Sequence, residues 1–320
     1  MAPDFGFIKA YPMSLKASRF KYLGQSLIEG FIKLNALAAI VGIFLIFLFV
    51  FRESLPIFFD PEIQQEANIA GFFSGRDWQP VSDNPRYSFW PIILGSFKVT
   101  LIALLFAVPV AVAAALYSSE FAPRRLKEGI KPMVEILAGI PSVVLGFFAL
   151  VFLASFLQGI FGWHIRLNAV NAGLALGVAV IPAVYSLAED AISAVPGSFR
   201  EAALGLGATP WQTAVKVVLP AAMPGVSAAV LFGMGRAIGE TMVVLMAAGN
   251  APQFTFDLLQ STRTLTATVA AELGEVVFGS AHYHTLFFIG LLLFGITYVI
   301  NLASYYLFQG LMARMYGKKN

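Results

Sequence analysis

The chain has 320 residues, of which 58% are hydrophobic and 12% charged, and its formal net charge is +3. The surface of a soluble domain needs far more charge, so this composition indicates a membrane protein. Cysteine is absent, which excludes disulfides and thiolate metal sites. The basic residues are spread over several segments, so the sequence does not indicate nucleic acid as a partner.

Six apolar segments are long enough to cross a bilayer core of about 30 Å as helices. The first is expected at 34–51, after a polar segment at 1–33, and a loop with net charge −3 follows at 52–97. Residues 98–310 contain the other five spans, and 311–320 form a polar tail. These five are expected near 99–117, 136–161, 169–188, 221–248 and 285–308. The predicted fold class is an all-α polytopic membrane protein.

Six spans place both termini on the same side of the membrane. The segments on that side, 1–33, 118–135, 189–220 and 311–320, carry most of the Lys and Arg residues. The opposite side carries Arg52, Arg76, Arg86, Arg166 and Arg263. The positive-inside rule therefore predicts that the termini and the loop 189–220 are cytoplasmic, with lipid around the spans.

Proline and glycine residues punctuate the spans. Pro141 and Pro182 each follow an isoleucine in consecutive spans, and both are expected to interrupt their helices. Such breaks are tolerated where helices line a path across the membrane. Glycines four residues apart predict close helix approach at two places: Gly173 with Gly177, and Gly235 with Gly239.

The stretch 201–220 is polar, although it lies between two strongly apolar segments, and reads EAALGLGATPWQTAVKVVLP. Just before it, Ser198 is followed three residues later by Glu201, which predicts a capping box at the start of a short helix. That helix should end near Gly205 or Gly207, because glycine adopts the left-handed backbone that closes a helix.

A second short helix is expected directly afterwards. Thr209 is a suitable N-cap, Pro210 suits the first helical position, and Gln212 completes a second capping box. Pro220 is expected to end this helix. Two short helices joined at Gly207 on the surface of a membrane protein have the shape of a docking element.

The same stretch resembles the EAA motif of ATP-binding-cassette (ABC) importer permeases. It matches every fixed position of that motif: Glu201, Ala202, Ala203, Gly207, Val217, Leu219 and Pro220. The resemblance implies that this loop docks in a groove of a cytoplasmic ATPase subunit. An ordinary amphipathic interfacial loop is the alternative.

Two charged residues lie inside the fifth span. Arg236 and Glu240 are four residues apart, so on a continuous helix they share one face. A charge at the bilayer centre costs about 2.5–3.5 kcal/mol, and such residues therefore pair or face a cavity. Two interpretations stay open: an ion pair that fixes helix packing, or a guanidinium facing a translocation path and held by Glu240. The planar fork of arginine suits phosphate, to which it donates two hydrogen bonds.

The segment 235–242, GRAIGETM, is similar to a motif of the phosphate-specific transport (Pst) permeases, and favours their PstC type. So is the segment 139–146, GIPSVVLG. The resemblance covers about 90–310 and implies a permease fold of the type I ABC importers. It also implies a phosphate path lined by Arg236, Glu240, Thr241 and Ser142. Alternatively, the Ser142 hydroxyl satisfies a carbonyl freed by the proline kink.

By the same resemblance, the chain is a transport subunit and not an enzyme. It has no Walker loop, so no cofactor is expected in this chain and ATP-Mg is expected in a partner ATPase. The implied partners are a second permease of the PstA type, two ATPase subunits of the PstB type and a periplasmic phosphate-binding protein of the PstS type. The implied location is the bacterial cytoplasmic (inner) membrane.

Three other functions remain open from the residues alone. An ABC permease for sulfate or molybdate would also use an intramembrane arginine. An ion-coupled secondary carrier would need no ATPase, and a membrane scaffold would transport nothing.

Three polar residues outside the motifs receive no function from the sequence. Lys98 lies at a span edge, where its side chain is expected to reach the headgroups. His282 and His284 lack a carboxylate or cysteine at metal-ligand spacing, so both are expected to be surface histidines.

Overall fold

A computed structural model of the chain describes residues 15–316. It contains two compact units, which divide after Arg52. The predicted polar ends at 1–33 and 311–320 are therefore described only in part. Their basic residues Lys9, Lys318 and Lys319 lie outside the described residues.

Helix α1, Leu15–Ser54, contains the first predicted span but begins well before it. Its apolar stretch extends over Leu27–Phe59, including the short helix that follows. From Leu27 onward, large apolar side chains are exposed all around α1. A helix that is apolar on every face is typical of a membrane span.

The part of the chain that the structure describes has six helical stretches long and apolar enough to cross a membrane, as predicted. After the first, they are α5 (Trp90–Glu120), α7 to α8 (Ser142–Phe161), α9 (Ala169–Ser193), α11 to α12 (Pro210–Gly239) and the first part of α15 (Ala281–Tyr316). Two of them include a π-helical turn, at Ala149–Leu153 and Ala214–Val218. Short elements complete the fold: α2 (Pro56–Phe59), α3 (Pro61–Glu66), α4 (Ile69–Ser74), β1 (Trp78–Gln79), β2 (Arg86–Tyr87), α6 (Arg124–Ala138), α10 (Gly197–Gly205), α13 (Met242–Ala247) and α14 (Leu265–Glu272).

The segment 52–97 is more ordered than a loop. It contains three short helices and the antiparallel pair β1–β2, in which Trp78 faces Tyr87. Phe72 and Phe89 stack with ring centroids 4.5 Å apart and are fully buried. These aromatic residues belong to a second apolar core, which also includes residues from the starts of α5 and α15 and is separate from the α5–α9 core.

Two of the three expected proline effects are wrong. The chain does break at 139–141, where α6 ends and α7 begins at Ser142. Helix α9, however, continues through the buried Pro182. Pro220 also lies inside a continuous stretch, Pro210–Gly239. The wider π turn just before Pro220 loosens the backbone where a proline ring would meet an α-helical carbonyl.

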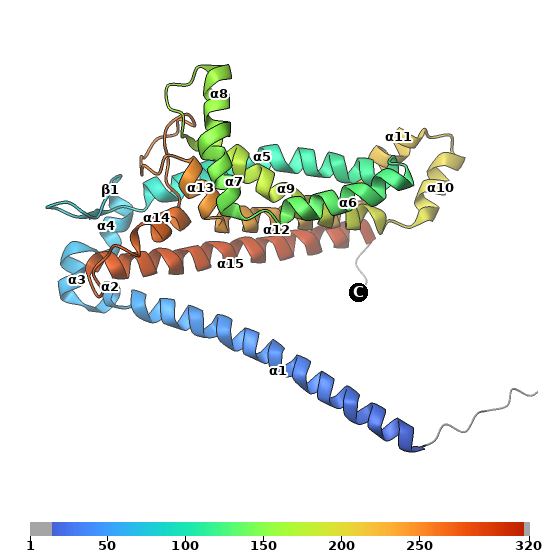
Figure 1. Cartoon of the computed structure of the whole chain (residues 1–320), viewed down its shortest axis with the longest axis horizontal. Helices are drawn as coiled ribbons and strands as arrows, with labels where there is room; N and C mark the ends of the chain where they lie inside the picture. The colour runs from blue at the N-terminus through green and yellow to red at the C-terminus, as the bar shows by residue number, and fades with distance from the viewer. Residues whose placement is uncertain (1–14, 317–320) are drawn as a thin grey trace, which may run out of the picture. The chain divides into compact units, whose positions relative to one another are not determined.

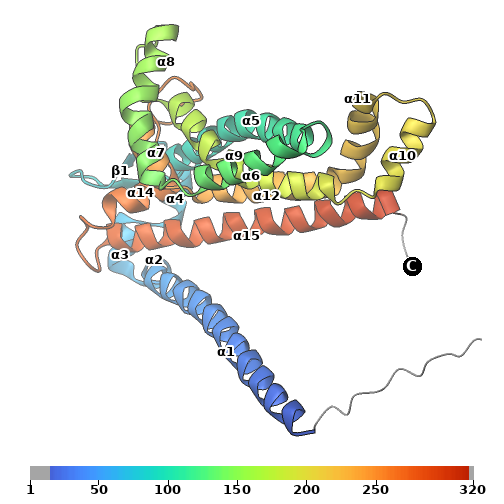
Figure 2. The same cartoon turned by 45° about the vertical axis from the view of Figure 1, so that its right-hand side comes forward.

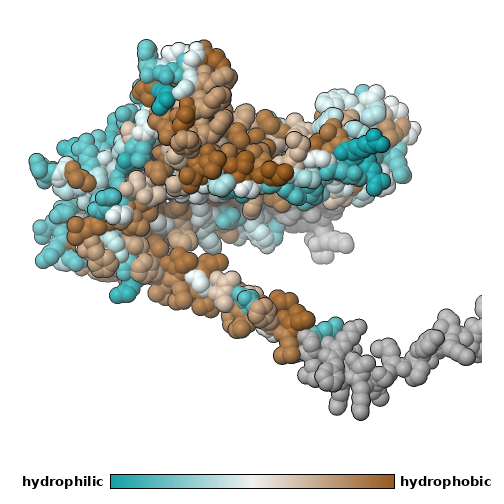
Figure 3. Space-filling view, viewed as in Figure 1, coloured by the Kyte–Doolittle hydropathy of each residue, from teal (hydrophilic) through white to brown (hydrophobic). Residues whose placement is uncertain are grey.

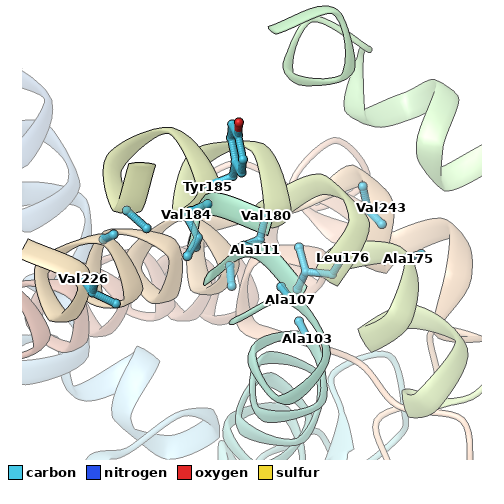
Figure 4. Close-up of a cluster of buried hydrophobic side chains, with 14 of the residues drawn as sticks. Ala103, Ala107, Ala111, Ala175, Leu176, Val180, Val184, Tyr185, Val226 and Val243 are labelled. Atoms are coloured by element: carbon cyan, nitrogen blue, oxygen red, sulfur yellow. The ribbon is translucent and has the colours of Figure 1, made fainter. Parts of the chain in front are cut away.

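The main core lies between α5 and α9. Alanines four residues apart form one face of α5, and all are fully buried: Ala103, Ala107, Ala111 and Ala115. Figure 4 shows three of them near Leu176, Val180 and Val184 of α9. Small residues at this spacing let two helix backbones approach closely, which is the usual means of helix association in membranes.

Only one of the two predicted glycine contacts is confirmed. A Cβ atom at Gly173 would lie 2.6 Å from Ile102 of α5, and one at Gly177 would lie 3.1 Å from the Ala103 carbonyl oxygen. Gly235 and Gly239 face open space instead. On α12 the close contact is at Gly233, where a Cβ would lie 2.4 Å from Val184 of α9.

Within the second unit, α10 and α11 lie at one end of the long helices, and α14 and β1 lie at the opposite end (Figures 1 and 2). On the face shown in Figure 3, the surface between the two ends is largely hydrophobic, whereas both ends are mainly hydrophilic. This pattern fits a bilayer around the middle of the helices and water at the two ends.

The α5–α9 contact can be tested with Gly173→Ala. We expect this change to lower the free energy of unfolding by about 1–3 kcal/mol, because the added methyl group overpacks the contact with Ile102. Thermal unfolding of the purified chain in detergent measures it. The matched control is Gly159→Ala, which faces open space on α8 and should be neutral or stabilising, because alanine favours helix. Equal effects of both changes would contradict the packing described.

Candidate functional site

The prediction that Arg236 and Glu240 share one face of a continuous helix is wrong. Helix α12 ends at Gly239, and Glu240 has an extended backbone with φ −72° and ψ 131°. The Glu240 carboxylate accepts hydrogen bonds from the backbone N–H groups of Thr241 (3.1 Å) and Met242 (3.2 Å). It therefore satisfies donors at the start of α13, an arrangement that competes with continuation of α12.

Contacts from a distant segment hold this junction. The Glu240 carbonyl accepts a hydrogen bond of 3.0 Å from the Thr266 hydroxyl on α14. The Thr241 hydroxyl donates to the Gly239 carbonyl over 3.4 Å. The fifth span is thus interrupted at the junction between α12 and α13, and hydrogen bonds stabilise this interruption.

Arg236 lies in the last turn of α12, and its side chain is exposed. Within the described residues it makes no hydrogen bond and no ion pair, with Glu240 or any other group. A guanidinium has five N–H donors, so this one is available to an anion or to another chain. The interpretation as an internal Arg–Glu pair is therefore wrong.

Ser142 begins α7, directly after the break, and is half-buried. Its hydroxyl makes no hydrogen bond to the described residues, so it does not satisfy a freed carbonyl. Helix α7 packs on α13, and a Cβ at Gly146 would lie 2.9 Å from the Met242 carbonyl oxygen. The fold thus brings the helices of the two predicted path motifs together, although it does not make Ser142 touch Arg236.

The first half of the polar loop differs from the prediction only at its start. Helix α10 begins at Gly197 without a side-chain cap, so the expected capping box at Ser198 is wrong. Ser198 already lies in the first turn. The end of the helix is as predicted, because Gly207 has φ +85° and donates its N–H to the Leu204 carbonyl over 2.9 Å.

The second half confirms the predicted start. Thr209 and Gln212 form a complete capping box, with hydrogen bonds of 3.3 Å and 3.0 Å. The helix then continues without a break to Gly239. One helix therefore connects the loop directly to the turn that carries Arg236.

The loop lies at one end of the second unit (Figures 1 and 2) and exposes apolar side chains there. They are Phe199, Leu204, Leu206 and Trp211, with 46%, 49%, 90% and 63% of their surface exposed. Of the motif residues, Glu201, Ala202, Gly207 and Pro220 are exposed, Leu219 is half-buried and Ala203 is buried. Clustered exposed apolar residues mark a protein interaction site.

Sequence reasoning missed a charged cluster at the opposite end. The Glu272 carboxylate pairs with Arg263, with His282 Nε2 (2.9 Å) and with the Trp78 indole N–H (3.1 Å). His284 is buried, and its Nδ1 lies 2.6 Å from the Glu53 carbonyl oxygen. Both histidines are therefore buried or nearly so, not at the surface.

Lys98 is also buried, contrary to the expectation that it reaches the headgroups. Its ammonium group donates to the carbonyls of Thr255 (3.0 Å) and Asp257 (3.2 Å). It thereby anchors the segment between α13 and α14 to α5. No signal in the sequence marks these two carbonyls as partners.

A family model described as "Binding-protein-dependent transport system inner membrane component" matches residues 107–315. The chain belongs to this family of transport permeases. It is thus a transport subunit, a multi-pass inner-membrane component of a system that depends on a binding protein.

Individual relatives show which permeases of this family the chain resembles. The chain is 36% identical over 239 residues to the probable ABC transporter permease protein YqgH of Bacillus subtilis, covering 74% of this chain and 76% of the relative. It is 32% identical to the phosphate transport system permease protein PstC of Mesorhizobium japonicum, covering 76% and 79%, and 33% identical to that of Haemophilus influenzae, covering 71% and 77%. The predicted resemblance to the PstC type is confirmed.

Solved structures support the fold. The MetNI methionine ABC transporter in an inward-facing conformation aligns with a TM-score of 0.53 at 21% identity, covering 70% of this chain and 94% of that one. A bacterial ABC transporter that imports alginate aligns with a TM-score of 0.59 at 15% identity, covering 90% and 98%. The predicted type I ABC importer fold is confirmed.

The Glu272 cluster gives an acid-sensitive contribution to stability. Burial raises the pKa of Glu272, but hydrogen bonds from His282 and Trp78 and the charge of Arg263 outweigh burial, so the pKa lies below the ordinary 4.5. The unfolded chain then takes up the proton first as pH falls. The contribution is therefore complete above about pH 4.5 and is lost as pH falls through the lower, folded-state pKa.

We expect Glu272→Gln to lower the free energy of unfolding at pH 7 by about 1–3 kcal/mol, because Arg263 loses its charged partner. The difference from the unaltered chain should shrink as pH falls below 4.5. Thermal unfolding in detergent at several pH values measures this. A difference that stays constant or grows toward low pH would contradict the assignment.

Proposed function

We propose that the chain is the membrane-spanning permease subunit of an ATP-driven importer of inorganic phosphate. One observation carries the proposal: Arg236, an exposed arginine without a partner among the described residues, lies at the end of the same continuous helix that begins in the exposed loop. An anion site and a docking site are thus connected by one element. Similarity to permeases named for phosphate transport supports phosphate as the anion.

The path residues have distinct roles in this proposal. The Arg236 guanidinium attracts the phosphate and donates paired hydrogen bonds to it. Ser142 begins α7 and supplies a hydroxyl donor. Thr241 lies in the break between α12 and α13, and its hydroxyl donates to phosphate in place of the Gly239 carbonyl. Glu240 does not hold Arg236; its carboxylate accepts hydrogen bonds from the N–H groups of Thr241 and Met242 and thereby keeps α12 from continuing past Gly239.

The loop residues transmit the work of ATP hydrolysis. The exposed surface that includes Glu201, Ala202 and Gly207 docks on an ATPase subunit, while Ala203 and Leu219 pack beneath it and Pro220 lies in the first turn of α12. ATP-Mg is bound by that partner, and this chain carries no cofactor. When the ATPases close, the loop moves and α12 re-angles, which exposes the Arg236 region to each side of the membrane in turn.

In the proposed assembly, each of these surfaces meets a different partner. A second permease of the PstA type faces Arg236 and completes the path, and two PstB-type ATPases lie on the cytoplasmic side. A periplasmic phosphate-binding protein of the PstS type docks at the opposite end, which includes the ordered segment 53–89. This arrangement places the termini in the cytoplasm, in agreement with the distribution of Lys and Arg.

Phosphate specificity is tested by Arg236→Ala in the complete complex in proteoliposomes. We expect ATP-dependent uptake of labelled phosphate to fall at least about tenfold, because a charge-assisted contact to the anion is lost. The matched control is Arg125→Ala, another exposed arginine, on α6, which should leave uptake unchanged. Uptake that excess sulfate or molybdate blocks better than phosphate would favour the other oxyanion permeases.

Coupling to ATP is tested by Gly207→Asp. A side chain at φ +85° strains the turn by about 1–2 kcal/mol, and we expect ATP-dependent uptake to be lost while the chain still reaches the membrane. Gly205→Ala, which also faces open space, should retain uptake. Uptake that survives Gly207→Asp and follows an ion gradient would support a secondary carrier instead.

A further inference from the structure

Arg200, in the first half of α10, has more polar contacts than any motif residue in the loop. Its Nε lies 3.1 Å from both carboxylate oxygens of Glu120, and its Nη2 lies 2.6 Å from Oε1. Nη1 donates to the Val195 carbonyl (2.6 Å) and Nη2 to the Ile192 carbonyl (3.1 Å). One guanidinium thus joins three segments: α10, the end of α5 and the end of α9.

This contact is partly shielded from water. The Glu120 side chain is 9% exposed and that of Arg200 is 25% exposed. The hydrogen bond to Glu120 raises the pKa of Arg200 further above its ordinary value, against the effect of burial. Charge-assisted, two-pronged contacts of this kind are strong and directional. The contact is also specific for arginine, because lysine has only one nitrogen.

The ends of α5 and α9 are tied to each other beside it. The hydroxyls of Ser119 and Ser193 lie 3.1 Å apart, and Ser193 donates to Glu189 over 2.9 Å. Lys127 of α6 lies 3.2 Å from the same carboxylate. Together with the alanine contact along their length, these bonds make α5 and α9 one packed pair at this end.

The contact of Arg200 is important because the chain does not connect the docking loop directly to α5. The docking loop is joined covalently to α12 on one side and, through the short segment 194–196, to α9 on the other. No such connection leads to α5. Within the described residues, the hydrogen bonds of Arg200 to Glu120 are the polar link between the EAA-like helix and α5.

We propose that Arg200 is a positioning residue for transport, which makes the docking helix α10 move together with the α5–α9 pair through Glu120 and the end of α9. The inference rests on the proposed function, because it concerns how ATPase motion reaches the helices. Without the contact between Arg200 and Glu120, α10 still docks through its exposed residues, but the loop deforms and α5 and α9 do not follow the motion of α10. ATP is then hydrolysed with less phosphate moved.

The test measures phosphate uptake and ATP hydrolysis in parallel, in proteoliposomes with the complete complex. For Arg200→Ala we expect phosphate imported per ATP hydrolysed to fall about tenfold, the equivalent of one lost charge-assisted contact. The ATPase subunits should still co-purify with the complex. Arg200→Lys, which keeps the charge but not the fork, should give an intermediate ratio, and Glu120→Gln should lower it as well.

The matched control is Arg124→Ala, which removes another arginine–glutamate pair, Arg124 with Glu128 at 2.9 Å within α6. Its transport ratio should equal that of the unaltered complex. If Arg200→Ala does not assemble, Arg200→Lys and Glu120→Gln decide. A ratio unchanged in the variants, or uptake and hydrolysis that fall in the same proportion, would overturn the proposal in favour of a purely structural anchor. Absence of phosphate import in the unaltered complex would overturn the proposed function, and with it the proposed role of Arg200.

Discussion

The close contact between α5 and α9 is the constraint on which the rest of the second unit depends. Fully buried alanines on α5 and glycines on α9 bring the two backbones together, where dispersion forces replace the hydrophobic effect that lipid does not supply. Helix α12 then packs on α9 at Gly233. Because α5 and α9 approach each other so closely, we expect them to move as one unit and the rearrangement to occur along α12.

Each end of the second unit contains a carboxylate held in defined contacts, whereas Arg236 in the fifth span has no partner among the described residues. Glu272 is paired at one end, and Glu120 and Glu189 are paired at the other. Arg236 has no partner in the described chain. A charge left unpaired at membrane depth is costly, so its partner is expected in the assembly: the transported anion, or the second permease across the path.

Local signals in the sequence predicted the middle of the docking loop correctly, although the local signals at Ser198, Pro182 and Pro220 failed. The capping box at Thr209 and Gln212 and the left-handed Gly207 depend on neighbours within a few residues, and both are present. Hydropathy was sufficient for the number of spans. The prediction that Arg236 and Glu240 share one helix face was wrong because the break at Glu240 is stabilised by Thr266, which is 26 residues away. The contact of Arg200 with Glu120 joins residues 80 apart, and no periodicity reveals such a pair.

The central claim is that the docking helix and the α5–α9 pair move as one body. Because the chain has no cysteine, spin labels can be attached at Ser198→Cys on α10 and Val110→Cys on α5, both exposed positions. The measurement is the distance between the two labels in the complete complex, without nucleotide and with ATP trapped. If α10 and the α5–α9 pair move as one body, we expect one narrow distribution that stays the same in both states. A distance that shifts on ATP binding in the unaltered complex would contradict it.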